Sequence, residues 1–214
     1  MRIAMLGGSF NPPHIAHLIL ADSVCCELGY DRLLFVPVNQ APHKAFAYAA
    51  SATDRLAMTQ ALVASDSRFI CEPCEIERGG ISYTYDTVRQ LQQKYAPLLE
   101  GRIGVILGED LARDYGKWEH AADLADCADL ILAARPKEML DAAFCNKPQG
   151  AYAVADESAC ISHFRHRTVT NPKIVLSSTD IRARIAQGKS WRYLVSDGVF
   201  RYIVERKLYG WRTV

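Results

Sequence analysis

The chain has 214 residues, of which 50% are hydrophobic and 23% are charged, and its formal net charge at pH 7 is +1. This length is enough to bury a core, and the small net charge excludes recruitment of nucleic acid by a strongly basic surface, so an anionic ligand must be bound by local groups. No stretch reaches the ~18 apolar residues of a membrane span, and the N-terminus lacks the features of a secretory signal. We therefore expect a cytoplasmic enzyme or binding protein. We expect no nucleic-acid or membrane partner.

Apolar runs alternate with helical patterns along the chain. In chain order we expect a strand at 2–6, a helix at 13–28 ending at Gly29, a strand at 32–38, a helix at 51–65, a strand at 68–77, a helix at 83–95, strands at 102–108, 128–135 and 173–178, and a helix at 179–187 ending at Gly188. Residues 145–171 lack periodicity and are expected to form a long irregular segment in which His163 and His166 are solvated. Continuous apolar strands separated by helices indicate a parallel sheet covered on both faces. The predicted fold is therefore α/β, a Rossmann-like open parallel sheet with helices on both faces, in a single domain at 1–214 whose C-terminal helical part begins at about 177.

The seven cysteines are expected to be reduced, because their number is odd and no secretory signal is seen. Cys71 and Cys74 have the spacing of a zinc or thioredoxin-like motif, but a zinc site needs two further ligands and a redox motif opens a helix. Their segment has an extended pattern, which favours strand thiols without a chemical role. Cys25 and Cys26 lie in an apolar helix and are expected in the core.

Polar motifs gather where the predicted strands end. In an open α/β sheet, ligands bind beyond the carboxyl ends of the strands. The sequences that follow four of the strands are GGSFNPPHIAH, NQAPHK, GEDLARDYGKW and SSTDIR. Their glycines, histidines, cations and tryptophan are suited to phosphate groups and an aromatic ring.

The first of these motifs places two histidines at the start of a helix. Gly7 and Gly8 permit a tight turn and a close approach to a ligand, and two prolines fit the beginning of a helix. His14 and His17 share a face of the first turn, at the positive end of the helix dipole. They could donate to phosphate oxygens during a displacement reaction. A metal pair and simple packing are the alternatives, but a metal needs a third ligand. The turn matches neither the dinucleotide-binding fingerprint nor the phosphate-binding loop.

The last motif opens the C-terminal helix. Ser177 and Asp180 have capping-box spacing, so free N–H groups are expected to face a ligand. Arg182 lies in the same turn, and its forked guanidinium suits phosphate. Taken alone, this would be an ordinary capped helix with a surface arginine.

Together these motifs resemble the nucleotidylyltransferase superfamily. GGSFNPPHIAH followed by SSTDIR is similar to its two signatures, G-x-[FY]-[DN]-P-x-H-x-G-H and I-S-S-T-x-I-R. With APHK, ISYTYDT, GEDLARDYGKW and AARP, the chain resembles the bacterial nicotinate-nucleotide adenylyltransferases from residue 3 to about 136 and again from about 174. The resemblance implies a fold of the nucleotidylyltransferase type. It also implies attack by the phosphate of nicotinic acid mononucleotide on the α-phosphorus of ATP, which gives nicotinic acid adenine dinucleotide and pyrophosphate in NAD biosynthesis.

The resemblance also implies roles for individual residues. The implied catalytic residues are His14, His17 and Arg182. The implied ATP-binding residues are Gly7, Gly8, Ser9, Phe10, His14, His17, Gly108, Asp110, Ser178, Thr179 and Arg182. The implied mononucleotide-binding residues are Lys44, Thr84, Asp110, Trp118 and Arg135. Mg²⁺ is expected on the ATP phosphates without a dedicated protein site.

Some features depart from the family or leave alternatives open. Ala16 replaces the usual glycine between the histidines, and residues 137–172 match nothing in the family. HIAH also resembles class I aminoacyl-tRNA synthetases, but a K-M-S-K-S-like loop is absent. Pantetheine-phosphate and glycerol-phosphate relatives lack the SYTYDT and GEDLARDYGKW combination. Nicotinamide mononucleotide or another phosphorylated acceptor, a non-catalytic nucleotide sensor, and a homo-oligomer all stay open.

Overall fold

The computed structural model describes residues 1–42, 49–134, 161, 164–170, 172 and 174–212, without the side chains of Asp110 and Ala134. Its centre is a parallel sheet of six strands in the order β3-β2-β1-β4-β5-β6. The strands are β1 (Ile3–Gly8), β2 (Arg32–Pro37), β3 (Phe69–Cys71), β4 (Gly104–Gly108), β5 (Asp129–Ala134) and β6 (His166–Thr170). The strand order reverses between β1 and β4, which is where ligands bind in folds of this type. The structure thus confirms the Rossmann-like fold class.

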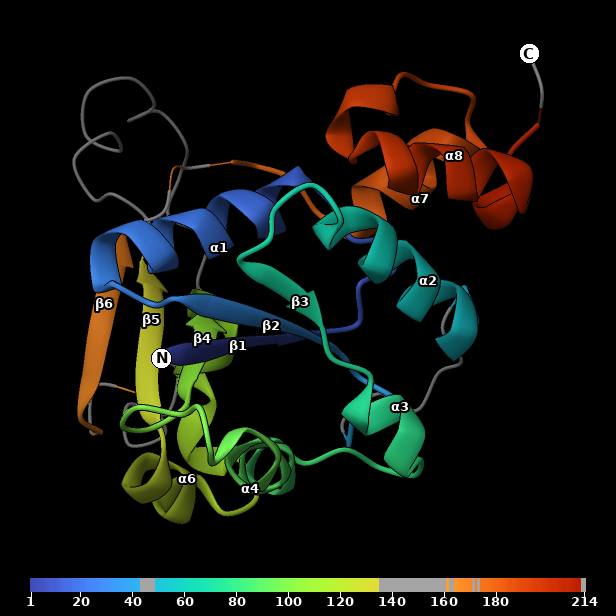
Figure 1. Ribbon diagram of the computed structural model, residues 1–214. Coiled ribbons are helices and arrows are strands. Elements are labelled where there is room, and N and C mark those ends of the chain that lie inside the picture. The colour runs from blue at the N-terminus through green and yellow to red at the C-terminus, as the bar shows by residue number, and fades with distance from the viewer. Residues whose placement is uncertain (43–48, 135–160, 162–163, 171, 173, 213–214) are drawn as a thin grey trace, which may run out of the picture.

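Helices cover both faces of this sheet (Figure 1). The α-helices are α1 (Ile15–Leu28), α2 (Ala52–Val63), α3 (Cys74–Arg78), α4 (Thr84–Tyr95), α5 (Glu109–Arg113), α6 (Ala121–Cys127), α7 (Ser178–Ala186) and α8 (Asp197–Glu205). The 3-10 helices are η1 (Tyr115–Lys117), η5 (Arg192–Leu194) and η6 (Leu208–Gly210). α1 and α2 lie on one face, and α4 and α6 lie on the other.

Alternation along β1 divides the core between these two faces. Ala4 and Leu6 pack with the helices on the α1 and α2 side, whereas Ile3 and Met5 pack on the α4 and α6 side. Successive side chains of a strand point to opposite faces, so a strand buried on both sides reads as a continuous apolar run. This explains why the sequence pattern identified β1 correctly.

The expected strand at 68–77 is much shorter than predicted. β3 ends at Cys71, and the helix α3 begins at Cys74. Pro73 has no N–H to donate to a neighbouring strand, which favours the end of the ladder there. Cys71 packs with the core on the α2 side, but Cys74 is buried in the core on the other face. The interpretation of both residues as strand thiols was therefore wrong for Cys74.

The last strand also differs from the prediction. β6 lies at His166–Thr170, inside the segment expected to be irregular, and 174–177 is not a strand. β6 is an edge strand with Val169 as its only buried residue, so its sequence carries no apolar run. Val175 is 88% exposed, which excludes a buried strand at that position. His166 is half-buried and its Nδ1 lies 2.9 Å from the carbonyl oxygen of Phe164, and His163 lies outside the described residues.

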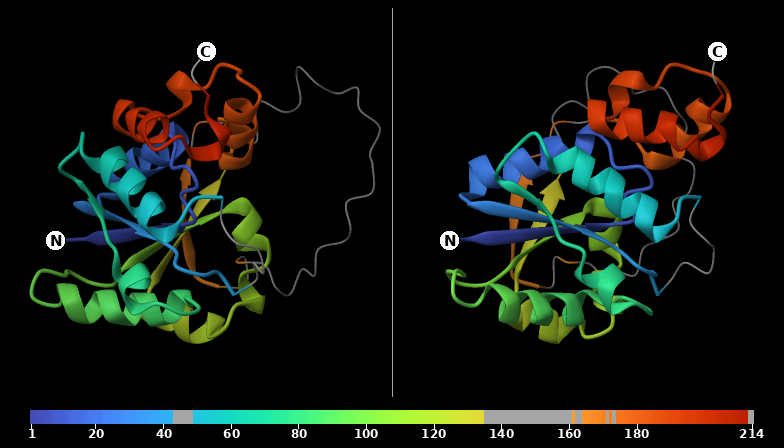
Figure 2. Two further views of the ribbon diagram at one scale, coloured as in Figure 1. Left: turned by 90° about the vertical axis from the view of Figure 1, so that its right-hand side faces the viewer. Right: turned by 45° about the vertical axis from the view of Figure 1, so that its right-hand side comes forward.

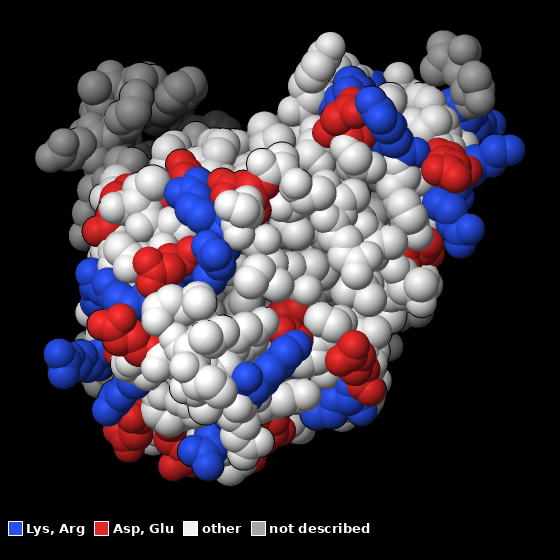
Figure 3. Space-filling model, in the orientation of Figure 1, with Lys and Arg blue, Asp and Glu red and all other residues white. Residues whose placement is uncertain are grey.

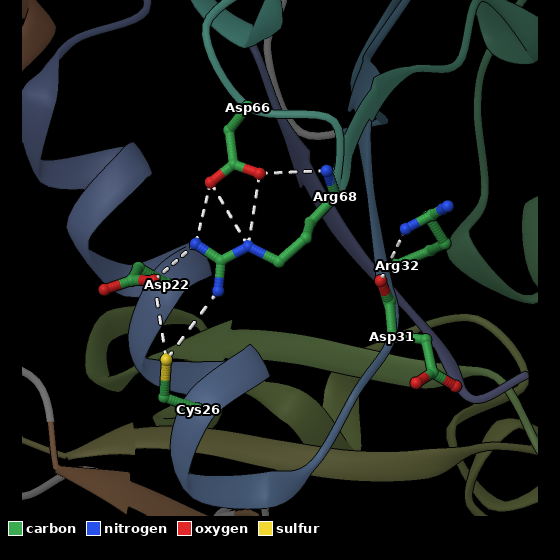
Figure 4. A network of polar contacts seen from close by, with 6 residues as sticks. All are labelled: Asp22, Cys26, Asp31, Arg32, Asp66 and Arg68. Atoms are coloured by element: carbon green, nitrogen blue, oxygen red, sulfur yellow. Dashed lines mark hydrogen bonds and ion pairs between the residues drawn. The ribbon is translucent and has the colours of Figure 1, made fainter.

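A polar network at the amino ends of the strands joins α1 to the start of β3 (Figure 4). The Arg68 guanidinium donates to Asp66 at 2.7 Å and to Asp22 of α1 at 2.6 Å. The Cys26 thiol donates to Asp22 at 3.5 Å and is exposed. Placing Cys26 in the core was therefore wrong, whereas Cys25 is buried as predicted.

The C-terminal helices pack against α2 and reach the beginning of α1 (Figure 2). A Cβ on Gly198 of α8 would lie 3.0 Å from the Ala61 carbonyl oxygen, so glycine at this position favours the close approach of α8 to α2. The Tyr202 hydroxyl donates to Asp54 Oδ1 at 2.9 Å, and the Trp191 and Trp211 rings meet edge to face. This packing fixes the position of α7 relative to the end of β1.

Candidate active site

The turn after β1 is built around a buried phenylalanine. Phe10 adopts a left-handed φ of 45°, and its ring packs against His17 and Phe35. A Cβ on Gly8 would lie 3.2 Å from this ring, so Gly8 leaves room for it. A second fixed point is the hydrogen bond from the Val38 N–H to the Gly8 carbonyl. The chain therefore leaves the sheet in one defined direction before α1 begins.

His14 and His17 lie together at the start of α1, as the spacing predicts. Their rings stack with centroids 3.8 Å apart, and the His14 N–H donates to Nδ1 of His17 at 3.1 Å. Because Nδ1 of His17 accepts, the proton of the neutral ring is on Nε2. The other ring has a buried Nδ1 that finds no partner among the residues that the structure describes.

Burial keeps both imidazoles neutral at neutral pH. Burial lowers the pKa of His14 to about 4. The pKa of His17 is also well below its ordinary value, because of burial and then the charge of His14. A bound anion would oppose this effect, since an opposite charge stabilises imidazolium. The pair is therefore suited to donating hydrogen bonds to an anion whose charge increases during a reaction.

The C-terminal motif contacts this same turn. Ser177 caps α7 by accepting from the Asp180 N–H at 3.1 Å, as predicted. The Ser178 hydroxyl donates to the Pro12 carbonyl at 2.8 Å. Arg182 is half-buried and donates to the Asn11 carbonyl at 2.7 Å and to the Thr179 hydroxyl at 3.2 Å. The two motifs, which are distant in sequence, thus form one polar surface beside the end of β1.

A cavity of about 540 Å³ adjoins this surface at the reversal of strand order. Its lining residues are Met5, Gly7, Gly8, Ser9, Val38, Ala41, Pro42, Glu75, Ser82, Tyr83, Thr84, Val105, Ile106, Leu107, Leu111, Lys117, Trp118 and Glu119. Gly7, Gly8, Ser9, Thr84 and Trp118 are among the residues that the sequence indicated. Gly8 and Ser9 therefore link the histidine turn to the cavity.

The start of α4 contributes polar groups to the wall of this cavity. Thr84 is the first residue of α4, and no side-chain cap is made by Tyr83 within the described chain. The Ser82 hydroxyl is buried and has no hydrogen-bond partner in the part of the chain that the structure covers. The Trp118 ring lies against Tyr115 on another side of the cavity. The cavity is thus lined mainly by apolar side chains, with an indole, a hydroxyl and the start of a helix among its polar groups, and such a lining suits a planar ring.

The remaining predicted residues have different outcomes. Gly108 ends β4 and precedes α5, and Asp110 belongs to α5 but its side chain is not described. Lys44 and Arg135 lie outside the described residues.

Sequence reasoning missed a buried arginine next to the site. Arg55 is 1% exposed and donates to the carbonyls of Ser9 at 3.0 Å, Val38 at 2.6 Å and Asn39 at 3.2 Å. It therefore joins the turns that follow β1 and β2. Arg55 lies on the buried stripe of α2 with Met58, and a cation at such a position was the signal that could have revealed it.

Glu75 was also missed because α3 was expected to be a strand. It is buried at the cavity, and its Oε1 accepts from the Thr87 hydroxyl at 2.7 Å. Burial raises the pKa of Glu75, while the hydrogen bond from the Thr87 hydroxyl opposes this shift.

Metal-binding and membrane-spanning features are absent from the described residues. They contain no group of three or more His, Cys, Asp or Glu side chains that could hold a metal ion. None of their helices is long and apolar enough to cross a membrane. On the face drawn in Figure 3, Lys and Arg side chains are interspersed with Asp and Glu side chains.

Comparison with known proteins gives consistent results. The family model described as "Cytidylyltransferase-like" matches residues 5–184. A "Probable nicotinate-nucleotide adenylyltransferase" of Treponema pallidum (strain Nichols) is 39% identical over 209 residues, which are 98% of this chain and 99% of the relative. The relative of the same name from Synechococcus sp. (strain JA-3-3Ab) is 38% identical over 208 residues, covering 97% of this chain and 94% of the relative.

Among solved structures, the chain resembles the Plasmodium falciparum nicotinic acid mononucleotide adenylyltransferase complexed with NaAD. The two are 19% identical, the match covers 99% of this chain and 98% of the other, and the TM-score is 0.72. At this identity the likeness shows the fold.

Proposed function

The chain belongs to the cytidylyltransferase-like family and, within it, to the nicotinate-nucleotide adenylyltransferases, and we propose from this that it transfers the adenylyl group of ATP to nicotinic acid mononucleotide. The products are nicotinic acid adenine dinucleotide and pyrophosphate, so the reaction belongs to NAD biosynthesis. One structural observation carries the proposal. His14, His17 and Arg182 meet at one turn, and this turn adjoins a cavity lined by Trp118 and the start of α4.

The chemistry needs no general base. The attacking group is the 5′-phosphate of the mononucleotide, which is already an anion at neutral pH. One of its oxygens bonds to the α-phosphorus of ATP, while the bond from that phosphorus to the oxygen bridging to the β-phosphate breaks. Catalysis then consists of positioning and charge stabilisation. This agrees with a site that is rich in hydrogen-bond donors.

We assign the ATP side of the site to the turn after β1 and the start of α7. The Nε2–H of His17 and the ring of His14 donate to the phosphates. Ser178, Thr179 and Arg182 hold the departing pyrophosphate. The backbone of Gly7, Gly8, Ser9 and Phe10 runs along the nucleotide, and Gly108 and Asp110 lie at its ribose. The neutral imidazoles gain affinity for a proton as the bound phosphates increase the local negative charge.

We assign the mononucleotide side to the cavity. Trp118 stacks on the pyridine ring, and N–H groups at the start of α4 near Thr84 bind its carboxylate. Lys44, Asp110 and Arg135 are assigned to the phosphate and ribose of the mononucleotide. A carboxylate accepts from such N–H groups, whereas a carboxamide presents donors of its own and leaves some of them unpaired.

Magnesium enters as part of the substrate. ATP is used as its Mg²⁺ complex, in which the ion neutralises phosphate charge. In this proposal the ion is held mainly by the phosphates, beside a turn whose described polar groups include imidazoles and hydroxyls. We also propose a single domain over 1–214, a cytoplasmic protein, and no nucleic-acid or membrane partner.

Pyrophosphate release tests the proposal. The purified protein is given MgATP with nicotinic acid mononucleotide or with nicotinamide mononucleotide, and kcat/KM is measured for each. We expect a preference for the nicotinate form by roughly a hundredfold or more. Equal values would refute the assignment of the carboxylate to the start of α4. ATP binding without pyrophosphate release would instead indicate a nucleotide sensor.

A further inference from the structure

We propose that Tyr209 is a positioning residue for adenylyl transfer, which holds the phosphate-binding turn in place through the side chain of Asn11. The proposal rests on the function proposed above and adds a residue to it. Tyr209 belongs to η6, near the C-terminal end of the described chain, and lies outside the motifs that indicated the site.

Asn11 is the residue of the turn to which the C-terminal segment hydrogen-bonds through both the backbone and the side chain. It is 4% exposed and lies between Phe10 and the two prolines that precede His14. Its carbonyl accepts from Arg182 at 2.7 Å, and its Oδ1 accepts from the Tyr209 hydroxyl at 2.8 Å. The side chain and the backbone of one buried residue are thus both fixed by residues more than 170 positions away.

The contacts from α7 and η6 differ in what happens to them during the reaction. Ser178 and Arg182 are assigned to the phosphates, so ATP competes for the groups that now hold the carbonyls of Pro12 and Asn11. The Tyr209 hydroxyl points to the Asn11 side chain and is assigned to no ligand. It can therefore keep its hydrogen bond when ATP binds, and the turn keeps its position.

The local structure of η6 favours this role. Tyr209 adopts a left-handed φ of 59°, which is unfavourable for a residue with a Cβ. Its side chain packs against the core formed by α2 and the C-terminal helices, and its hydroxyl also lies 3.8 Å from Met58 Sδ. Burial raises the pKa of this hydroxyl, so it stays protonated and donates at neutral pH.

The test compares Tyr209→Phe with Tyr202→Phe. Each change removes one hydroxyl from the C-terminal segment, but the Tyr202 hydroxyl donates to Asp54 and does not touch the turn. Tm, kcat, the KM values of both substrates and the affinity for α,β-methylene-ATP are measured for both variants and the wild type. We expect Tyr209→Phe to lower kcat/KM for ATP about tenfold or more, because a small displacement of catalytic groups is costly. KM for the mononucleotide and the kinetics of Tyr202→Phe should change less than about twofold.

The outcomes separate this proposal from the function itself. If Tyr209→Phe matches the wild type, or if both variants lose activity in proportion to Tm, Tyr209 has only a structural role and the proposal fails. If the wild type itself releases no pyrophosphate, the proposed function fails. The affinity for α,β-methylene-ATP then decides the role of Tyr209, because a selective loss in Tyr209→Phe supports it and equal affinities overturn it.

Discussion

The change His17→Ala tests the histidine pair most closely. His17 is expected to have two roles, because its Nε2–H is assigned to the phosphates of ATP in the proposed function while its Nδ1 accepts from the His14 N–H at 3.1 Å. We expect kcat to fall roughly a hundredfold or more, with a smaller change in KM, since the donor acts mainly on the transition state.

The size of the effect follows from the two contacts that are lost. Removing a preorganised donor from a developing anion costs about 2.7–4 kcal/mol of transition-state stabilisation. Removing Nδ1 leaves the partly buried His14 N–H without its acceptor and releases the stacked His14 ring, whose centroid lies 3.8 Å away. An orphaned N–H of this kind costs about 1–3 kcal/mol of folding stability.

A second variant separates the helix-start contact from the chemistry of the imidazole. His17→Gln retains an acceptor that can reach back to the N–H at the start of the helix and a neutral amide donor, but unlike imidazole it cannot become a cation beside the phosphates. The assay is steady-state pyrophosphate release, combined with urea unfolding of each variant. His17→Gln should regain stability while kcat stays well below that of the wild type. Near-normal kcat in His17→Ala would refute the reasoning, because the ring would then have only a structural role.

Three further predictions concern the rest of the site. Arg182→Lys removes the forked contact to Asn11 and Thr179, so kcat/KM for ATP should fall about tenfold while KM for the mononucleotide is unchanged. Unaltered ATP kinetics would show that Arg182 has no role in binding ATP. Trp118→Ala should raise KM for both mononucleotides by roughly tenfold through lost stacking, and a collapse of their kcat/KM ratio would show that the indole discriminates between them. Burial lowers the pKa of His14 from 6.5 to about 4, so between these values the unfolded chain binds a proton that the folded chain does not. The contribution of His14 to the free energy of unfolding should therefore decrease as the pH falls from 6.5 to 4, by at most about 1.4 kcal/mol per pH unit, and His17 adds to the slope in the same direction. In His14→Phe this part of the pH dependence should be missing, and an unchanged slope would contradict the assignment.

The sequence patterns identified the buried strands well and the edge strands poorly. β1, β2, β4 and β5 are covered on both faces, so their apolar runs report burial directly. β6 pairs with β5 at the edge of the sheet, and Val169 is its one buried residue. Its sequence therefore contains no apolar run that would indicate a strand. β3 is three residues long, and the turn at Pro73 places Glu75 on a helix at the cavity. Edge pairing depends on the neighbouring strand, which a local pattern does not contain.

In the candidate site, too, residues within local motifs were indicated by the sequence, whereas residues that act through distant contacts were not. His14, His17 and Arg182 were found because each lies in a short motif at a strand or helix end. Asn11 and Tyr209 were not found, because their contact joins residues 198 positions apart. Arg55 was missed since its three carbonyl partners come from two different turns. The single-domain interpretation and the individual site roles stay predictions.

Transfer of labelled ATP tests the central claim most directly. The protein is incubated with nicotinic acid mononucleotide and MgATP labelled at the α-phosphate, and the products are separated by chromatography. Adenylyl transfer predicts that the label appears in a dinucleotide, in equimolar amount with unlabelled pyrophosphate. Label that stays in ATP or appears in ADP, with no labelled dinucleotide, would contradict the account.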